Sequence, residues 1–188
     1  MKLGRDFLRI GKTYVVADLH LGLVRIADRA VLERLSSLAD RGEVVVAGDA
    51  RHLGKPFPLE DLLSLPNVVI VKGNHDAGLE AERVVVKGKY AIFHGHTLPD
   101  EAFDAKVWIV GHAHPAVYID GYKERVFMLG EVEGRKVVVL PSFNELCAST
   151  AVNLEKPAGV IFRKWDYSDW DVVLEDGTVL TLRSLRKI

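Results

Sequence analysis

Five short apolar runs, each followed at once by polar side chains, constrain this sequence most. The run Val68–Val71 is β-branched throughout and leads through Lys72 into Gly-Asn-His-Asp at 73–76. An apolar run without alternation predicts a strand buried on both faces. In open α/β sheets ligands bind at the carboxyl ends of strands, so the polar residues predict a site. The other four runs are Tyr14–Ala17 before Asp18 and His20, Val44–Ala47 before Gly48 and Asp49, Tyr90–Phe93 before His94 and His96, and Val107–Val110 before His112 and His114.

Strand and helix signals alternate in the first half of the chain. Val24–Asp40 has apolar residues at helical spacing, and Leu59–Leu65 predicts a second, shorter helix between prolines. This alternation predicts parallel strands joined by crossovers. We expect an α/β fold in which two sheets pack face to face with helices outside, in a single domain over residues 1–188. After Asp76 nearly all signals predict β-strands, apart from a short helical piece near Asp100–Ala105. The predicted strands in this half are Arg83–Val86, Val117–Asp120, Arg125–Leu129, Lys136–Leu140, Gly159–Trp165, Trp170–Leu174 and Thr178–Leu182.

The bulk composition excludes several classes of protein. With 188 residues, 48% of them hydrophobic, the chain can bury a sizeable core. A formal net charge of -1 argues against general, charge-driven binding of nucleic acid. The single cysteine, Cys147, cannot form an internal disulfide, and on sequence alone it is a small buried hydrophobe. No apolar run is long enough to span a bilayer, and no signal-peptide core begins the chain, so we expect a cytoplasmic protein without a membrane partner.

The polar residues after the five runs have the chemistry of a two-metal site. Asp18 and His20 are two residues apart, which would point both side chains the same way at a strand end. Asp49 could bridge a second ion with its two oxygens. Mixed oxygen and nitrogen donors suit manganese, iron or zinc better than calcium or magnesium. The remaining candidate ligands are the carbonyl oxygen of Asn74 and the imidazoles of His94, His112 and His114.

Such a site would hydrolyse phosphate esters. Two ions about 3.5–4 Å apart can clamp a phosphate and generate a metal hydroxide for in-line attack. His75, beside the candidate ligand Asn74, would be free to protonate the leaving oxygen. Asp76 could orient a neighbouring imidazole.

The order of these motifs resembles the calcineurin-like metallophosphoesterase superfamily. The shared blocks are D-x-H at Asp18 and His20, G-D at 48–49, G-N-H-D at 73–76, a histidine at His94, and G-H-x-H at 111–114. They cover roughly residues 13 to 115. The short chain and the 18–22 block look most like the small phosphoesterases related to the SbcD nucleases or encoded beside DNA ligases.

The resemblance implies a four-layer αββα sandwich and two divalent ions, with manganese favoured over iron, zinc or nickel. It assigns Asp18, His20 and His114 to the first ion and Asp49 to the bridge. It assigns Asn74, His94 and His112 to the second ion, and makes His75 the acid or leaving-group stabiliser. The chain departs from many members after Gly48-Asp49, where Ala50-Arg51-His52 follows. Arg51 could reach a substrate phosphate. His52 and His96 are candidates for hydrogen bonds near the metals or the substrate.

Several functions remain open on the sequence alone. We expect a phosphodiesterase whose substrate could be a nucleotide or nucleic acid. The enzyme alternatives are a phosphomonoesterase and a nucleotide pyrophosphatase. A non-catalytic scaffold of the same fold is a rival, as is a single structural zinc, which would leave Asp49, Asn74 and His94 unexplained. The sequence leaves protein partners and oligomeric state open, a homo-oligomer included.

Overall fold

A computed structural model describes residues 1–185. Its first sheet has the order β1-β2-β3-β4-β5, and the three strands β3, β4 and β5 are parallel, as the alternating signals predict. An antiparallel hairpin of β1 and β2 extends this sheet beside β3. The strands are β1 (Lys2–Leu3), β2 (Leu8–Ile10), β3 (Thr13–Val16), β4 (Glu43–Val46) and β5 (Val68–Ile70).

The second sheet contains seven strands in the order β15-β14-β11-β12-β8-β7-β6. Its centre is parallel, because β8 pairs in parallel with both β7 and β12, while the outer strands are antiparallel. The strands are β6 (Val85–Lys87), β7 (Tyr90–Phe93), β8 (Val107–Val110), β11 (Phe127–Val132), β12 (Arg135–Val139), β14 (Asp171–Val173) and β15 (Val179–Thr181). A small third sheet joins β10 (Tyr122–Arg125), β9 (Pro115–Ile119) and β13 (Thr150–Ala151).

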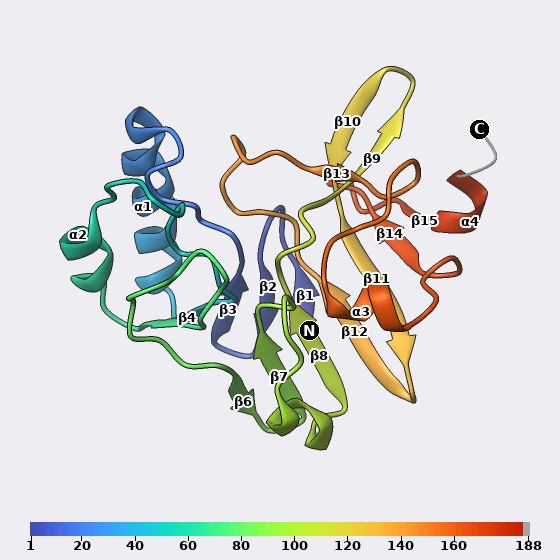
Figure 1. The fold of residues 1–188 in the computed structure, drawn as a ribbon, viewed down its shortest axis with the longest axis horizontal. Coiled ribbons are helices and arrows are strands. Elements are labelled where there is room, and N and C mark those ends of the chain that lie inside the picture. Colours follow the sequence, from blue (N-terminus) through green and yellow to red (C-terminus); the bar gives the residue numbers. More distant parts are fainter. Residues whose placement is uncertain (186–188) are drawn as a thin grey trace.

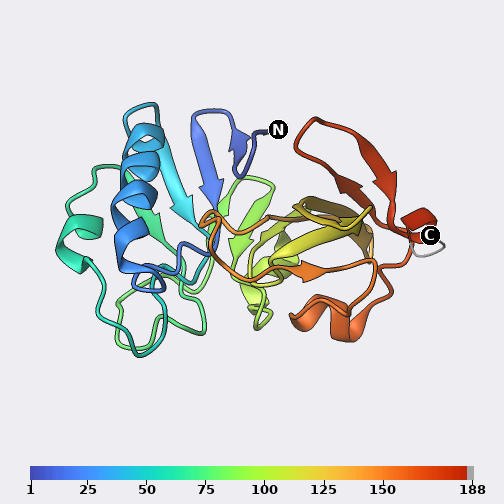
Figure 2. The ribbon, with the colours of Figure 1, turned by 90° about the horizontal axis from the view of Figure 1, so that it is seen from above.

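The two large sheets pack face to face between layers of helices, which is the four-layer arrangement expected from the motifs (Figures 1 and 2). Successive residues of each strand point to opposite faces. In β8, for example, Ile109 packs between the sheets, whereas Trp108 packs on the outer face. In β4, Val45 faces the second sheet and Val46 faces the helices. Burying each such side chain contributes roughly 1.5–3 kcal/mol to folding.

Helices cover the outer face of each large sheet. The helix α1 (Arg25–Ala39) lies at the predicted place and packs Val31, Leu35 and Leu38 against the first sheet. A shorter helix, α2 (Leu59–Leu63), lies beside it. On the far side are η1 (Asp100–Asp104), α3 (Val160–Lys164) and α4 (Leu182–Leu185). None of the helices in the described part of the chain is long and apolar enough to cross a membrane.

Two sequence predictions about individual elements were wrong. The strand expected at Gly159–Trp165 is the helix α3, a single turn whose Val160, Ile161 and Phe162 are all buried against the outer core. Three consecutive buried residues fit a short helix lying on a sheet, and this packing overrides their β propensity. The strand β5 is not buried on both faces. It is the edge of the first sheet, and its three residues are only half-buried.

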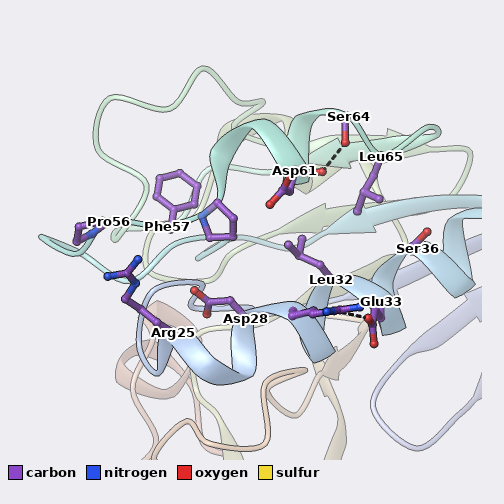
Figure 3. Close-up of a pocket in the computed structure, with 12 residues that line it drawn as sticks. Arg25, Asp28, Leu32, Glu33, Ser36, Pro56, Phe57, Asp61, Ser64 and Leu65 are labelled. Carbon is purple, nitrogen blue, oxygen red and sulfur yellow. Dashed lines mark hydrogen bonds and ion pairs between the residues drawn. The ribbon is translucent and has the colours of Figure 1, made fainter.

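A cavity of about 670 Å³ lies between α1, α2 and the segment that precedes α2 (Figure 3). Apolar side chains such as Leu32, Phe57 and Leu65 form part of its wall. Asp28 also lines it, and its carboxylate accepts the backbone N–H of Gly22 at 2.9 and 3.0 Å. None of the candidate metal ligands lines this cavity, so it is separate from the site predicted by the motifs.

Candidate metal centre and active site

The predicted site residues come from both large sheets and meet where their parallel strands end. Asp18 and His20 follow β3, Asp49 follows β4, and residues 73–76 follow β5. His94 follows β7, and residues 111–114 follow β8 of the other sheet. Because parallel strands end at the same edge, five separate loops converge on one place.

The backbone at these loops takes an unusual conformation. Among residues 1–185, eight non-glycine residues have a positive φ, and five of them are candidate ligands. The values for Asp18 and His20 are 59° and 43°. These two side chains therefore meet through a left-handed turn and not through the alternation of an extended strand, which was the sequence argument. Left-handed non-glycine residues cluster at functional sites. The other three ligands in this conformation are Asp49, His112 and His114.

The first group of donors surrounds Asp18, which is fully buried. Its Oδ1 lies 3.3 Å from Nε2 of His114. That Nε2 is also 3.3 Å from Nε2 of His20. On the far side of His114, Nδ1 is 2.9 Å from the carbonyl oxygen of Ala148, which fixes the ring and directs Nε2 into the site. The three residues assigned to the first ion thus converge.

The second group of donors surrounds His94, which is 1% exposed. Its Nε2 lies 3.0 Å from Oδ1 of Asn74 and 3.2 Å from Oδ2 of Asp49. Its Nδ1 is 3.0 Å from the carbonyl oxygen of Ala47, which holds the ring. The His112 ring lies 4.8 Å from the His94 ring, centroid to centroid. The residues assigned to the second ion also converge.

Asp49 joins the two groups through one oxygen. Its Oδ2 lies 3.6 Å from His20 and 3.2 Å from His94. Its Oδ1 instead accepts the backbone N–H of His75 at 2.8 Å. From the sequence we expected both oxygens to form the bridge, whereas only Oδ2 faces both donor groups.

The donor set fits divalent metal binding. One donor atom each from Asp18, His20 and Asp49 lies within 4.8 Å of the others, and the same holds for Asp49, His94 and His112. Nδ1 of His20 is buried without a hydrogen-bond partner. No lysine or arginine lines the cavity of about 270 Å³ at this place to balance the buried carboxylates. Carboxylate, amide and imidazole donors in this arrangement suit manganese, iron or zinc.

Burial and charge shift the ionisation of these groups. Burial lowers the pKa of His20 to about 4 and that of His112 to about 4, so both imidazoles are neutral near pH 7. Burial would also lower the pKa of His114, but the adjacent Asp18 carboxylate outweighs it and raises that pKa to about 9. Burial alone would raise the pKa of Asp18, yet the imidazoles of His114 and His94 hold it below its usual value.

His75 lies on the wall of the same cavity. Its ring centroid is 4.8 Å from that of His20. The backbone N–H of Leu53 donates to its Nδ1 at 3.2 Å. A nitrogen that accepts a hydrogen bond carries no proton, so the proton of the neutral ring is on Nε2. This tautomer leaves His75 with an Nε2–H group that can donate a hydrogen bond.

The four residues proposed to lie beside the metals or the substrate have different surroundings. His52 lines the cavity, 5.4 Å from the His75 ring, and its buried Nδ1 has no partner. His96 lies 5.2 Å from the His94 ring but is not among the residues lining the cavity. Arg51 does not line it either. Its Nε donates to the His75 carbonyl oxygen at 3.0 Å, so its side chain supports the His75 loop.

Asp76 contacts backbone and not the imidazole that the sequence argument gave it. Its fully buried carboxylate accepts the N–H groups of Ala50, Arg51 and Gly73, at 3.3, 3.1 and 2.8 Å. It therefore ties the loop of Asp49 to the loop of His75.

The segment 141–148 supports the site in a way that the sequence motifs did not reveal. The N–H of Phe143 donates to the carbonyl oxygen of Ala17 at 2.8 Å, and Nδ2 of Asn144 donates to that of Leu19 at 2.9 Å. Arg34 and Arg125 hold the segment from the other side, through the carbonyl oxygens of Phe143 and Ser142. From the sequence, the resemblance to the small phosphoesterases indicated that the segment 141–144 could lean over the site, but it did not indicate these contacts.

Cys147 belongs to the same segment and lies at the cavity wall. Its Sγ is 3.9 Å from the carbonyl oxygen of Asp18, and burial raises the pKa of its thiol to about 12. The sequence interpretation of a small buried hydrophobe is right about burial but missed this position.

Comparison with known proteins gives a family and several distant likenesses in structure. A search of curated proteins found no match. A predicted phosphoesterase from Streptococcus pneumoniae is 20% identical, with a TM-score of 0.45 over 89% of this chain and 91% of that chain. Vps29 from Entamoeba histolytica is 21% identical, with a TM-score of 0.45 over 89% and 95%. The phosphoesterase YfcE from E. coli is 18% identical, with a TM-score of 0.43 over 90% and 96%.

The family rests on a match to the whole motif-bearing region. Residues 12–144 match the family model of the calcineurin-like phosphoesterase superfamily domain, which is more than half of the chain. This region contains all five loops that converge on the two donor groups. The chain therefore belongs to the calcineurin-like phosphoesterase superfamily, as its motifs indicated.

Proposed function

We propose that this protein hydrolyses phosphodiesters with two divalent ions, manganese being favoured, and that His75 aids departure of the leaving group. One observation carries the proposal. Two groups of metal donors share Oδ2 of Asp49, and His75 lies on the wall of the same small cavity. Family membership supports metal-dependent hydrolysis of phosphate esters in general.

The candidate ligands would be shared between the two ions as follows. Asp18, His20 and His114 would hold one ion, Asn74, His94 and His112 the other, and Asp49 both. Bound there, the ions would supply positive charge to the phosphoryl oxygens and lower the pKa of water. The loops after the strands fix the direction of each donor before substrate arrives, which is the positioning that such chemistry requires.

His75 would donate a hydrogen bond from Nε2–H to the oxygen that leaves and would stabilise the negative charge that develops there. Its Nδ1 is occupied by the N–H of Leu53, which sets the tautomer, and Arg51 holds its backbone carbonyl. A leaving alkoxide carries a concentrated negative charge, so a hydrogen-bond donor placed to stabilise it is worth about 10²- to 10³-fold in rate.

The lining of the cavity favours a diester over a monoester. A phosphate monoester carries up to two negative charges at neutral pH, and sites for such groups commonly use arginine or lysine. No residue lining this cavity is an arginine or lysine. A diester carries a single charge and needs less compensation beyond the metal ions. Cyclic nucleotides and nucleic acids are the diester-containing substrates we propose to test first.

The experiment compares esters with different leaving groups in the presence of manganese. We expect the wild type to cleave an aryl phosphodiester faster than the matching aryl monoester. For His75→Ala we expect a small loss with a good leaving group such as nitrophenolate, and a loss of about 10²-fold or more with an alkoxide.

Matched measurements separate the possible failures. Manganese binding by His75→Ala should equal that of the wild type, because His75 is not a donor in either metal group. Equal losses on both leaving groups would contradict stabilisation of the leaving oxygen by His75. Faster cleavage of the monoester would favour the phosphomonoesterase. Metal-loaded protein that cleaves neither ester nor any nucleotide would favour the non-catalytic scaffold.

A further inference from the structure

The only thiol of the chain lies beside the first group of metal donors. Cys147 Sγ and one ring nitrogen each from His20 and His114 all lie within 4.8 Å of one another. Cys147 is 8% exposed, and it lines the same cavity as these histidines. Two imidazoles and a thiol are the donor types of many zinc sites in proteins.

A second observation points to a ligand at this place. His20 is 5% exposed, yet its Nδ1 has no hydrogen-bond partner. Its Nε2 faces Nε2 of His114 across 3.3 Å. Two imidazole nitrogens that face each other need either a proton or a cation between them. A divalent cation bound beside the thiol would take the lone pairs of both rings.

The backbone couples the thiol to the ligand set. The carbonyl oxygen of Ala148, the residue after Cys147, lies 2.9 Å from Nδ1 of His114. The contact that orients His114 therefore also fixes the position of the thiol. The second donor group, around His94, has no sulfur atom among its members.

We propose that Cys147 is an additional ligand of the ion held by Asp18, His20 and His114, and that it makes this half of the site select a thiophilic ion such as zinc. This proposal rests on the proposed two-metal function. On binding, the thiol loses its proton to solvent and the sulfur lone pair forms the metal bond. The other group of donors, around His94, contains no sulfur and would keep its preference for a harder ion such as manganese. The loaded protein would then hold two different metals.

The rival explanation is that the thiol only supports the loop of Asp18. Its Sγ lies 3.9 Å from the carbonyl oxygen of Asp18, within reach of a weak S–H hydrogen bond. In Cys147→Ser the hydroxyl could still donate to that oxygen. The two explanations therefore differ in whether sulfur itself is required.

The experiment uses cobalt(II) as a spectroscopic probe with the wild type, Cys147→Ser and Cys147→Ala. Bound cobalt gives visible d–d bands, and a thiolate ligand adds a charge-transfer band in the near ultraviolet. Since the chain has one cysteine, such a band can come only from Cys147. We expect it in the wild type, and we expect it to be absent from both variants while the d–d bands remain.

Competition between metals gives the second readout. We expect zinc to bind Cys147→Ser about tenfold or more weakly than the wild type, with manganese affinity little changed. Cobalt d–d bands without a charge-transfer band in the wild type would overturn the role of Cys147 but leave the two-metal function standing. Failure to bind cobalt, zinc or manganese at all would overturn both. Parallel loss of zinc and manganese in Cys147→Ala alone would establish the supporting role instead.

Discussion

The carboxylate of Asp76 accepts the backbone N–H of Arg51 at 3.1 Å, although 25 residues separate them. The same carboxylate accepts the N–H groups of Ala50 and Gly73. One buried side chain thus holds two site loops against each other. All three hydrogen bonds come from backbone N–H groups, so holding the loops together requires both carboxylate oxygens of Asp76 as acceptors.

Asp76→Asn should therefore damage both stability and the site. The amide nitrogen of asparagine would face a backbone donor in place of an acceptor oxygen, and we expect unfolding free energy to fall by about 2–4 kcal/mol. Denaturant unfolding measures this change. The exposed Asp61→Asn is the control, with an expected change within about 0.5 kcal/mol. Equal effects of the two substitutions would contradict the role of Asp76.

Asn144→Ala should weaken metal binding as well as the fold. Its Nδ2 donates to Leu19, beside His20, and its Oδ1 accepts the N–H of Leu146. Losing both bonds should cost about 1–3 kcal/mol of unfolding free energy and loosen the loop of Asp18 and His20.

The chain offers a matched control for this prediction. Asn153 is also buried and also makes two bonds, accepting the N–H of Tyr118 at 3.0 Å and donating to its carbonyl oxygen at 2.9 Å. It lines a cavity with Tyr118, apart from the site residues. Asn153→Ala should lose similar stability in denaturant titration and keep its manganese affinity in calorimetry. A drop in affinity for both variants would show a general loss of stability only.

Gly48→Ala should disrupt the second donor group. A Cβ at Gly48 would collide with the ring of His94, and its φ of +89° already disfavours a side chain. Gly121→Ala is the control, because its φ is +86° and a Cβ there meets nothing within 4 Å. We expect Gly121→Ala to cost about 1–2 kcal/mol from strain alone. Gly48→Ala should cost several times more and bind less manganese. Similar costs would mean that the loop has room to move.

Metal affinity should rise with pH between about 6.5 and 9. The pKa of His114 is raised to about 9, above the ordinary 6.5, so near pH 7 this imidazole is protonated and a cation must displace the proton. His20 and His112, with pKa values of about 4, are already neutral there. Calorimetric titration with manganese in buffers of different ionisation enthalpy should show proton release that declines above pH 9. His114→Gln should reduce that release without abolishing it, because, against the effect of burial, Asp49 and Asp18 raise the pKa of His94. Equal affinity at pH 6.5 and 8.5 would contradict this assignment.

The sequence predicts the donor loops well because local signals and topology agree there. A short apolar run marks each strand, and the polar residues after it must lie at the strand end. Parallel pairing then brings Asp18 and Asp49 to the same edge. The burial of Val68–Ile70 was misjudged because no local feature separates an edge strand from a central one. The α3 segment was misjudged because its three apolar residues fit either structure, and packing decided between them.

The segment that supports the site escapes sequence reasoning for a different reason. Asn144 and Cys147 are more than a hundred residues from the loop that they contact, and no periodicity connects them to it. Their role depends on β12 ending beside the first sheet, which is a fact of the whole fold. The left-handed turns at Asp18 and His20 are equally invisible, because aspartate and histidine also occur freely in extended backbone.

Those left-handed turns lower the stability of the folded chain at the candidate metal-binding residues. Each non-glycine residue in that conformation costs roughly 1–2 kcal/mol, and five of the candidate ligands adopt it. Random mutation and selection for heat resistance would thus find stabilising changes at these same positions, most simply glycine, and each would remove a donor atom. At these positions, a substitution that raises stability would lower activity. A variant selected for stability alone would keep both sheets of the fold. It would lose the side chains proposed to hold the metal ions, and with them the activity.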